Sequence, residues 1–224
     1  FEGESKMKQL IIIILFASII FADTIIVDQS GNGDFYTISD AVDAASNNDT
    51  IFIHAGVYVE GGISTYSNQL YFIGVDKNSV IWTSGTDGAL YVSSNSYVRE
   101  ITFSDTYVQN YSATLDVNRC IFDNSYISLP NASTCNVINS VFRQTDNGFL
   151  TNSQIVSRYV NIYNCVFYQV SHVFYEHIMF LEVWNSIFID VSDTDPSDYS
   201  NSELYSYTCY YDSEIQDGYG NITV

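Results

Sequence analysis

A six-residue pattern that ends in Phe occurs five times between residues 98 and 188. Each copy begins with Val or Ile, and the Phe-to-Phe steps are 19, 20, 25 and 21 residues. The copies are Val98–Phe103, Val117–Phe122, Val137–Phe142, Ile162–Phe167 and Val183–Phe188. A period of this size is typical of solenoids, in which each repeat forms one coil that is stable only when stacked on its neighbours.

Counting back from each Phe gives the register of the repeat. Apolar residues stand five positions before every Phe and seven positions before the last four, and mostly small residues stand two positions before the Phe. Side chains alternate between the faces of a strand, so the parity of the pattern changes once, between positions −5 and −2. We therefore expect two short strands joined by a bend. Asn139, Asn164 and Asn185 stand at this bend, where Asn tolerates the left-handed conformation.

Each coil thus has two strands, and a variable connection with a third strand leads to the next coil. The predicted fold class is all-β, a single-stranded right-handed parallel β-helix formed by residues 23–224. One more coil fits, with Leu204, Cys209 and Tyr211 at positions −7, −2 and 0. Either Ser213–Val224 folds across this coil, or the chain is truncated, or the open edge pairs with another chain in self-association.

The first part of the chain predicts a cap for the solenoid. Ile38, Ala41, Val42 and Ala45 fall on one face of a short helix over residues 37–45. Thr37 can cap this helix, with Asp40 three residues later in a capping-box arrangement. Short strands are expected at Thr24–Val27, Ile51–Ile53, Ala55–Tyr58, Leu70–Phe72 and Val80–Trp82.

Residues 1–22 have the form of a targeting segment. Met7 and Lys8 give a positive start, Leu10–Phe21 is apolar, and Ala22 is a small residue suited to cleavage. We interpret 1–22 as upstream residues plus a signal peptide with Met7 as initiator, the alternative being an uncleaved signal anchor. This predicts a secreted or cell-surface protein without a membrane span after cleavage. Asn-x-Ser/Thr sequons, which accept glycans in secreted proteins, begin at Asn48, Asn110, Asn131 and Asn221.

The charge balance excludes several partners. The chain has 26 Asp and Glu against 7 Lys and Arg, a net charge of −19. A nucleic acid or an anionic lipid surface is therefore not expected as a partner, because both contacts need clustered cations. The same charge favours cation binding and disfavours a polyanionic substrate unless metal ions bridge the two.

Two N-terminal stretches carry a family resemblance. Ile25–Ile38 and Asp43–Tyr58 resemble the N-terminal segment of pectinesterases and other pectin-lyase-like right-handed parallel β-helix proteins. The Asn-Cys-x-Phe strings are similar to the inner ladder of that family, and the resemblance extends from Thr24 to Asp212. It implies the β-helix fold and a relation to polysaccharide-active enzymes. A leucine-rich repeat is the alternative, since it also combines Asn with a period of about 20–29 residues.

The catalytic motifs implied by the resemblance are not intact. Pectinesterases place a Gly-aromatic-Gln-Asp-Thr string after one rung, where this chain has Phe142–Leu150 with Asp146 shifted by one position. One coil later, His172 stands where the nucleophilic Asp is expected, and His cannot replace a carboxylate nucleophile without changing the chemistry. The paired Asp residues that polygalacturonase-like hydrolases need, an Asp-Asp pair among them, are also missing. Catalysis is therefore uncertain.

Two clusters remain as candidate sites. If residues 171–177 form the third strand, His172 and Glu176 share a face, with Asp146 and Arg158 about one coil away. Such a group can move a proton or bind a metal, and the alternative is a polar strand edge facing solvent. The second cluster is an acidic loop whose oxygen ligands suit Ca²⁺, the alternative being a solvated loop. It contains Asp190, Asp193, Asp195 and Asp198.

The register argues against disulfide bonds. Cys120, Cys165 and Cys209 occupy one inward row with Ser140 and Ser186 between them. Alternate coils are about 9.6 Å apart, beyond the reach of a disulfide. With Cys135 in a different row, we expect four buried free thiols that act as small core residues.

Many tyrosines fall outside the inward rows. Exposed aromatic rings can stack on sugars or simply pack under loops. We therefore expect a β-helix for carbohydrate or protein interaction, with a polysaccharide or a surface protein as partner and without catalysis. The alternatives are a divergent pectate lyase-like or pectinesterase-like enzyme and a purely structural surface protein. The tyrosines are Tyr107, Tyr111, Tyr126, Tyr159, Tyr163, Tyr168 and Tyr175.

Overall fold

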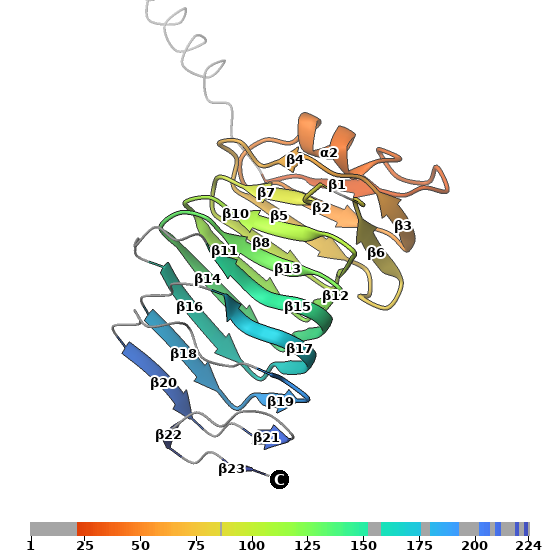
Figure 1. The fold of residues 1–224 in the computed structure, drawn as a ribbon. Coiled ribbons are helices and arrows are strands. Elements are labelled where there is room, and N and C mark those ends of the chain that lie inside the picture. Colours follow the sequence, from red (N-terminus) through yellow and green to blue (C-terminus); the bar gives the residue numbers. More distant parts are fainter. Residues whose placement is uncertain are drawn as a thin grey trace, which may run out of the picture.

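The chain forms a parallel β-helix in a computed structural model. The structure describes residues 22–85, 87–151, 158–175, 180–192, 202–206, 209–211, 218–219 and 222–223. Every pairing between its strands is parallel, and the coils stack from the N-terminal helix α2 towards the C-terminus (Figure 1). The coils consist of strands and turns, without the helix per repeat seen in many leucine-rich repeats, so that alternative is wrong.

The strands form three faces. Sheet A is one face and consists of β1 (Thr24–Val27), β2 (Thr50–Ile53), β5 (Leu70–Gly74), β8 (Ser96–Arg99), β11 (Thr114–Asn118), β14 (Ser133–Ile138), β16 (Arg158–Tyr163), β18 (Phe180–Trp184), β20 (Ser202–Ser206) and β22 (Gly218–Tyr219). The second face, the main path of sheet B, consists of β3 (Gly56–Val59), β6 (Val80–Thr83), β9 (Thr102–Ser104), β12 (Ile121–Asp123), β15 (Val141–Thr151), β17 (Val166–Tyr175), β19 (Ile187–Ile189), β21 (Cys209–Tyr211) and β23 (Ile222–Thr223). The third face, which joins sheet B at β15, consists of β4 (Ile63–Ser64), β7 (Leu90–Val92), β10 (Tyr107–Asn110) and β13 (Tyr126–Leu129).

The Phe register of the repeat is confirmed. Phe122 pairs with Phe103 on one side and Phe142 on the other, and Phe167 pairs with Phe142 and Phe188. All five side chains are fully buried. The centroids of neighbouring rings lie 4.5–5.2 Å apart with interplanar angles of 5–20°. Offset stacking of this kind adds about 0.5–1.5 kcal/mol per pair to the free energy of burial.

The stack begins earlier than the repeat pattern indicates. Trp82 pairs with Phe103, and its ring centroid lies 5.7 Å from that of Phe103. Tyr58 pairs with Trp82 one coil further towards the N-terminus. Both side chains are fully buried. The aromatic row therefore extends over the N-terminal coils as well.

Each coil turns at left-handed residues. Asn139, Asn164 and Asn185 have φ angles of 53°, 55° and 48° at the corner between the two strands, as predicted. Their amides form a ladder, in which Asn185 Nδ2 donates to Asn164 Oδ1 (2.7 Å) and Asn164 Nδ2 to Asn139 Oδ1 (3.3 Å). Glu100 and Arg119 have the same conformation at this corner of the preceding coils. The corner thus keeps one geometry along the stack.

A second row of left-handed residues was not predicted. Each of these residues stands two positions after the Phe of its coil, directly after β9, β12 or β19 or within β15 or β17, and marks the second corner of the coil. Because both corners of a coil are fixed, equivalent residues stay in register from coil to coil. The residues are Asp105, Asn124, Gln144, Gln169 and Asp190, with φ between 46° and 54°.

The small residues two positions before each Phe have a structural role. Ser140 Oγ accepts a hydrogen bond from the Cys120 N–H (3.1 Å) and donates one to the Ile138 carbonyl (2.9 Å). Ser186 makes the same pair of bonds with Cys165 and Trp184. A buried serine hydroxyl thus satisfies backbone groups that the bend frees from the ladder.

The N-terminal helix caps the solenoid as expected. α2 spans Ile38–Ala44, one residue short of the predicted range at each end, and buries Ile38, Ala41 and Val42. Thr37 is the N-cap, and its Oγ1 accepts the Asp40 N–H (3.1 Å). The carboxylate of Glu60 accepts the N–H groups of Ile38 and Ser39 (3.0 and 2.9 Å), which anchors the helix to the first coil. In the described residues no helix is long and apolar enough to cross a membrane.

The three described cysteines are buried free thiols. Cys120, Cys135 and Cys165 form no disulfide, as the register predicted. Burial raises the pKa of the Cys120 and Cys165 thiols to about 12 and also raises the pKa of Cys135. The side chain of Cys209 lies outside the described residues.

The predicted register of the last coil is wrong by one residue. Phe188 pairs with Tyr210 rather than Tyr211, and Leu181 pairs with Glu203 rather than Leu204. Cys209 therefore pairs with Ile187 and does not continue the row of small residues. Beyond this coil, β22 pairs with β20 and β23 with β21, so both ladders continue within residues 213–224.

Truncation of Phe142 tests the aromatic row. Phe142 packs between Phe122 and Phe167 and also contacts Phe149. We expect Phe142→Ala to lower the free energy of unfolding by about 3–5 kcal/mol, because it leaves a cavity between coils. Ile187→Ala, at an outward position with 41% exposure, is the control and is expected to change it by about 0.5 kcal/mol or less. If denaturant titrations show that both variants lose the same free energy of unfolding, the assigned register is contradicted.

Thiol reactivity tests the burial of the cysteines. The thiolate is the reactive form, and a pKa of about 12 keeps Cys120 and Cys165 protonated in the folded protein at pH 8. We expect alkylation of native protein, mapped by mass spectrometry, to leave Cys120, Cys135 and Cys165 unmodified, and alkylation in denaturant to modify all three. Stability is also expected to fall as pH rises above the ordinary thiol pKa of 9.0, because only the unfolded thiols then ionise. Rapid alkylation of the native thiols would show that the coils open.

Candidate functional site

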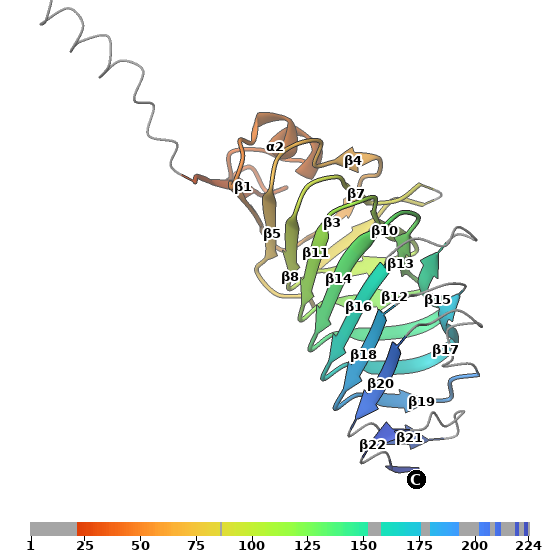
Figure 2. The same cartoon turned by 90° about the vertical axis from the view of Figure 1, so that its left-hand side faces the viewer.

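A polar groove follows the N-terminal edge of sheet A. Three adjoining hollows of about 220–300 Å³ run across the starts of β5, β8, β11, β14 and β16, strands that form a continuous column in Figure 2. Asn95 lines all three hollows, and Gln69 and Thr114 each line two. We call this surface the sheet A groove. Its lining residues are Asn47, Ser67, Gln69, Tyr71, Ser93, Ser94, Asn95, Ser96, Tyr97, Ser112, Ala113, Thr114, Asp116, Ala132, Ser133, Thr134 and Tyr159.

The groove is built from the short turns that precede the strands. These turns are not constrained by the inward rows, so they carry Asn, Ser, Gln and Thr. Asn95 Oδ1 accepts the Thr114 N–H of the next coil (2.9 Å), and Asn47 Oδ1 accepts the Gln69 N–H (2.7 Å). Side-chain amides thus tie neighbouring turns together and give the groove a fixed shape.

Tyrosines stand at both ends of the groove. Tyr71 and Tyr97 occupy equivalent positions on β5 and β8, with ring centroids 6.3 Å apart. Gln69 Nε2 donates to the Tyr71 hydroxyl (2.7 Å) and orients the ring. At the other end Tyr159 is 43% exposed and stacks on Phe180, with centroids 4.5 Å apart and an interplanar angle of 4°. These rings offer flat apolar faces within a polar lining.

The outward face of sheet A continues the polar surface beyond the groove. Asn136 Nδ2 donates to Asp116 Oδ1 (2.6 Å), and Asn161 Nδ2 donates to Asn136 Oδ1 (2.8 Å). Glu182 is next in register and accepts a hydrogen bond from the Tyr163 hydroxyl (2.9 Å). Asp116 is the one ionisable carboxylate in the groove lining, which contains no Lys, Arg or His.

The structure places part of the predicted catalytic cluster on neighbouring coils. Asp146 lies exposed on β15, and Ser171 on β17 donates a hydrogen bond to its Oδ1 (3.5 Å). The next residue along β15, Asn147, pairs with His172. Asp146 and His172 are therefore one coil apart, as expected. Glu176 lies outside the described residues.

Arg158 lies on a different sheet from Asp146 and His172. It is fully buried on β16 in sheet A, whereas Asp146 and His172 lie on sheet B strands. Its Nε donates to the Leu129 carbonyl (2.7 Å) and its Nη2 to the Pro130 carbonyl (3.1 Å). Arg158 therefore holds the turn after β13 against the next coil.

Of the four Asp residues in the acidic loop, the structure describes only Asp190. Asp190 is exposed and has a φ of 53° at the second corner of its coil, so its conformation serves the turn. Asp193, Asp195 and Asp198 lie outside the described residues. In the part of the chain that is described, no group of three or more His, Cys, Asp or Glu side chains is arranged to hold a metal. A calcium site in this loop stays a prediction.

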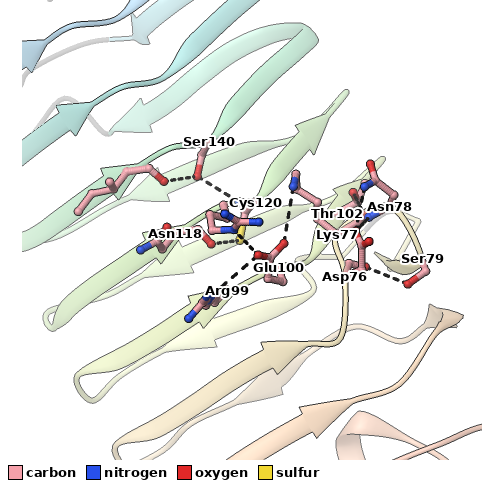
Figure 3. Close-up of polar contacts among 12 residues, drawn as sticks. Asp76, Lys77, Asn78, Ser79, Arg99, Glu100, Thr102, Asn118, Cys120 and Ser140 are labelled. Carbon is pink, nitrogen blue, oxygen red and sulfur yellow. Dashed lines mark hydrogen bonds and ion pairs between the residues drawn. The ribbon is translucent and has the colours of Figure 1, made fainter.

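Three of the cations in the described residues gather around Glu100 at one corner of the coils. Figure 3 shows Glu100, which is largely buried, with Lys77 and Arg99 around it. Lys77 Nζ lies 3.6 Å and Arg99 Nε 4.0 Å from the Glu100 carboxylate, and Arg119 donates to the same group. Arg143 is paired with Asp123 (2.7 Å). Lys77, Arg99 and Arg119 share the single carboxylate of Glu100, and these contacts join three successive coils.

The remaining tyrosines lie mainly on the third face. The rings of Tyr107 and Tyr126 stack with centroids 5.2 Å apart, and the Tyr91 and Tyr107 hydroxyls are 3.2 Å apart. The hydrogen bond with Tyr91, together with burial, raises the pKa of Tyr107 to about 12. Tyr111 is 39% exposed beside Tyr91. These rings pack largely against each other, whereas Tyr159 lines the sheet A groove.

Solved structures resemble the chain as a whole. No protein-family model and no curated protein matches the sequence. A pectin methylesterase from Erwinia chrysanthemi matches with a TM-score of 0.53 and 13% identity, covering 86% of this chain and 80% of that one. A pectin methylesterase from Aspergillus niger matches with a TM-score of 0.53 and 14% identity, covering 89% and 85%. The chain has the pectin-lyase-like parallel β-helix fold.

A third match differs in length. The pectin methylesterase from carrot has a TM-score of 0.50 and 16% identity, and the match covers 83% of this chain but 62% of the carrot enzyme. The pectin-lyase-like fold predicted from the N-terminal strings and the Phe register is thus confirmed. At these identities the likeness concerns the fold and does not extend to the reaction.

Arg158 provides a test that separates a structural from a catalytic role. We expect Arg158→Ala to lower the free energy of unfolding by about 3 kcal/mol, because it leaves the buried Leu129 carbonyl and the partly buried Pro130 carbonyl without their charged donor. Arg99→Ala, which removes a 46% exposed side chain, is expected to change it by about 0.5 kcal/mol or less. Thermal and denaturant unfolding of both variants measure the difference. An Arg158→Ala protein as stable as the unaltered chain would contradict the structural role.

Proposed function

We propose that this protein binds a neutral polysaccharide along the sheet A groove without catalysing a reaction on it. The observation that carries the proposal is the groove itself, which crosses five strands and is lined by amides, hydroxyls and three tyrosines. Amides and hydroxyls exchange hydrogen bonds with sugar hydroxyls, and tyrosine rings provide apolar faces for the sugar ring. A long shallow surface suits an extended chain better than a small molecule.

The charge of the protein supports a neutral ligand. The groove lining carries Asp116 and no cation, and the whole chain has a net charge of −19. A polyuronate would therefore approach against both the local and the overall field. A neutral ligand would distinguish this protein from the structurally similar pectin methylesterases.

The proposed lack of catalysis rests on residue chemistry. His172 stands where the resemblance to pectinesterases implies a nucleophilic Asp, and Asp146 is shifted from the expected position of the first acid. The buried Arg158 already binds two carbonyl groups. With His172 in place of the Asp, the chain lacks the carboxylate nucleophile that ester hydrolysis of this type requires.

We further propose that binding takes place outside the cell. The leader-like segment at 1–22, with its apolar run and Ala22, supports export. Extracellular polysaccharide or a glycosylated surface is then the partner. The second candidate is a divergent polysaccharide-active enzyme, for which the contact of Asp146 with Ser171 next to His172 is the supporting observation.

A binding panel with purified protein tests the proposal. We expect binding to some neutral glycans and none to polygalacturonate at low salt, with no release of methanol, reducing ends or unsaturated product from any of them. Product formation that is lost in Asp146→Asn and His172→Ala would favour the second candidate. If the protein binds none of the glycans and self-associates, a structural surface protein would be favoured.

Substitution of Tyr97 tests the position of the site. We expect Tyr97→Ala to weaken binding of a neutral oligosaccharide about fivefold, equivalent to about 1 kcal/mol of lost stacking. Tyr97→Phe keeps the ring and is expected to bind nearly as well. Tyr168→Ala, which removes a 39% exposed ring on β17 in sheet B, is the control and is expected to leave the dissociation constant unchanged. Calorimetric titrations in which Tyr168→Ala is weakened and Tyr97→Ala is not would contradict the assignment.

A further inference from the structure

We infer that Asn48 and Asn131 are acceptor sites for N-linked glycans, and that Asn110 is not. All three begin an Asn-x-Ser/Thr sequon, so the sequence does not distinguish them. The inference rests on the export that forms part of the proposed function. The structure separates the three residues by exposure and by the hydrogen bonds of their side-chain amides.

Asn48 and Asn131 have accessible side chains. Both residues are exposed and lie in turns, Asn48 before β2 and Asn131 before β14. The Asn48 backbone N–H donates to the Gln69 carbonyl (2.7 Å), and the Asn131 carbonyl accepts from Ser133 Oγ (3.3 Å). Among the described residues, neither side-chain amide has a hydrogen-bond partner. Both Nδ2 atoms can therefore carry a substituent that extends into solvent.

Asn110 is in the opposite situation. It is fully buried at the end of β10. Its Nδ2 donates to the Ala113 carbonyl (2.9 Å) and to the Thr134 carbonyl of the next coil (3.0 Å), while its Oδ1 accepts the Ala113 N–H (3.1 Å). Both hydrogens of the Asn110 side-chain amide are thus in hydrogen bonds, and one of these bonds joins two coils.

The chemistry of the modification explains the difference. The Asn Nδ2 forms a bond to the anomeric carbon of a lipid-diphosphate-linked oligosaccharide, the bond from that carbon to the diphosphate oxygen breaks with its electron pair, and the amide loses one proton. At Asn110 this would remove one of two engaged hydrogens and place a sugar inside the coil. Because transfer precedes folding, a chain modified at Asn110 is expected not to fold, so the exported protein carries Asn110 unmodified.

The two acceptor sites flank the sheet A groove. Asn47, the neighbour of Asn48, lines the groove at its N-terminal end, and Ala132, the neighbour of Asn131, lines it at the other end. The two glycans would therefore stand at opposite ends of the groove and leave the central coils, around Asn95, open.

Site-resolved mass spectrometry tests the inference. The full chain is expressed in a eukaryotic secretory host, and the folded exported protein is treated with peptide N-glycosidase in heavy-oxygen water, which labels each formerly glycosylated Asn. We expect label at Asn48 and Asn131 and none at Asn110. Label at Asn110 in the folded protein, or its absence from either exposed site, would overturn the inference. This readout does not involve ligand binding, so glycosylated protein without affinity for polysaccharide would contradict the proposed function alone.

Two matched variants supply a second measurement. Asn110→Gln lengthens a buried amide by one methylene group and is expected to reduce the yield of folded exported protein several-fold. Asn131→Gln makes the same change at an exposed site and is expected to lose one glycan with its yield and melting temperature unchanged. Normal yield and stability of Asn110→Gln would contradict the structural role assigned to the Asn110 amide.

Discussion

The in-register stacking of buried aromatic rings between coils is the interaction on which the rest of the structure depends. The ring centroid of Phe142 lies 4.5 Å from that of Phe122 and 5.0 Å from that of Phe167, so each coil is positioned by its neighbours on both sides. Left-handed residues at two corners keep the coils congruent, and buried serines satisfy the backbone at the first bend. No coil can bury its apolar side alone, and stability therefore comes from the stack.

This arrangement separates the residues that maintain the fold from those that are free to bind. The inward rows accept Phe, Val, Ile and small residues, whereas the turns before the sheet A strands have no such restriction. Stacking then places Gln69, Asn95 and Thr114, which come from three successive coils, along one polar groove. The four cations near Glu100 and Asp123 are paired with carboxylates. The groove is thus the surface where an uncharged ligand meets polar and aromatic side chains without a cation in the lining.

The inner architecture could be predicted from the sequence because periodic burial leaves a periodic pattern. Counting from Phe167 gave the strand pairing, the Asn corner and the free state of Cys120 and Cys165. The predicted register of the last coil was wrong because Tyr210 and Tyr211 are adjacent aromatic residues, and the repeat pattern does not distinguish between them. The groove and the role of Arg158 were missed for another reason. The groove consists of turn residues from several coils, and Arg158 binds a backbone carbonyl group of another coil. Stacking brings these groups together, and they have no regular spacing in the sequence.

Hydrogen exchange of the protein with and without a neutral oligosaccharide tests the central claim most directly, since it locates the ligand without altering the chain. The account predicts added protection in the turns and strand starts at 67–71, 93–97, 112–116 and 132–134, and no change in 141–151 or 166–175. Protection confined to 141–151 and 166–175, around Asp146 and His172, would contradict it and assign the site to the sheet B strands.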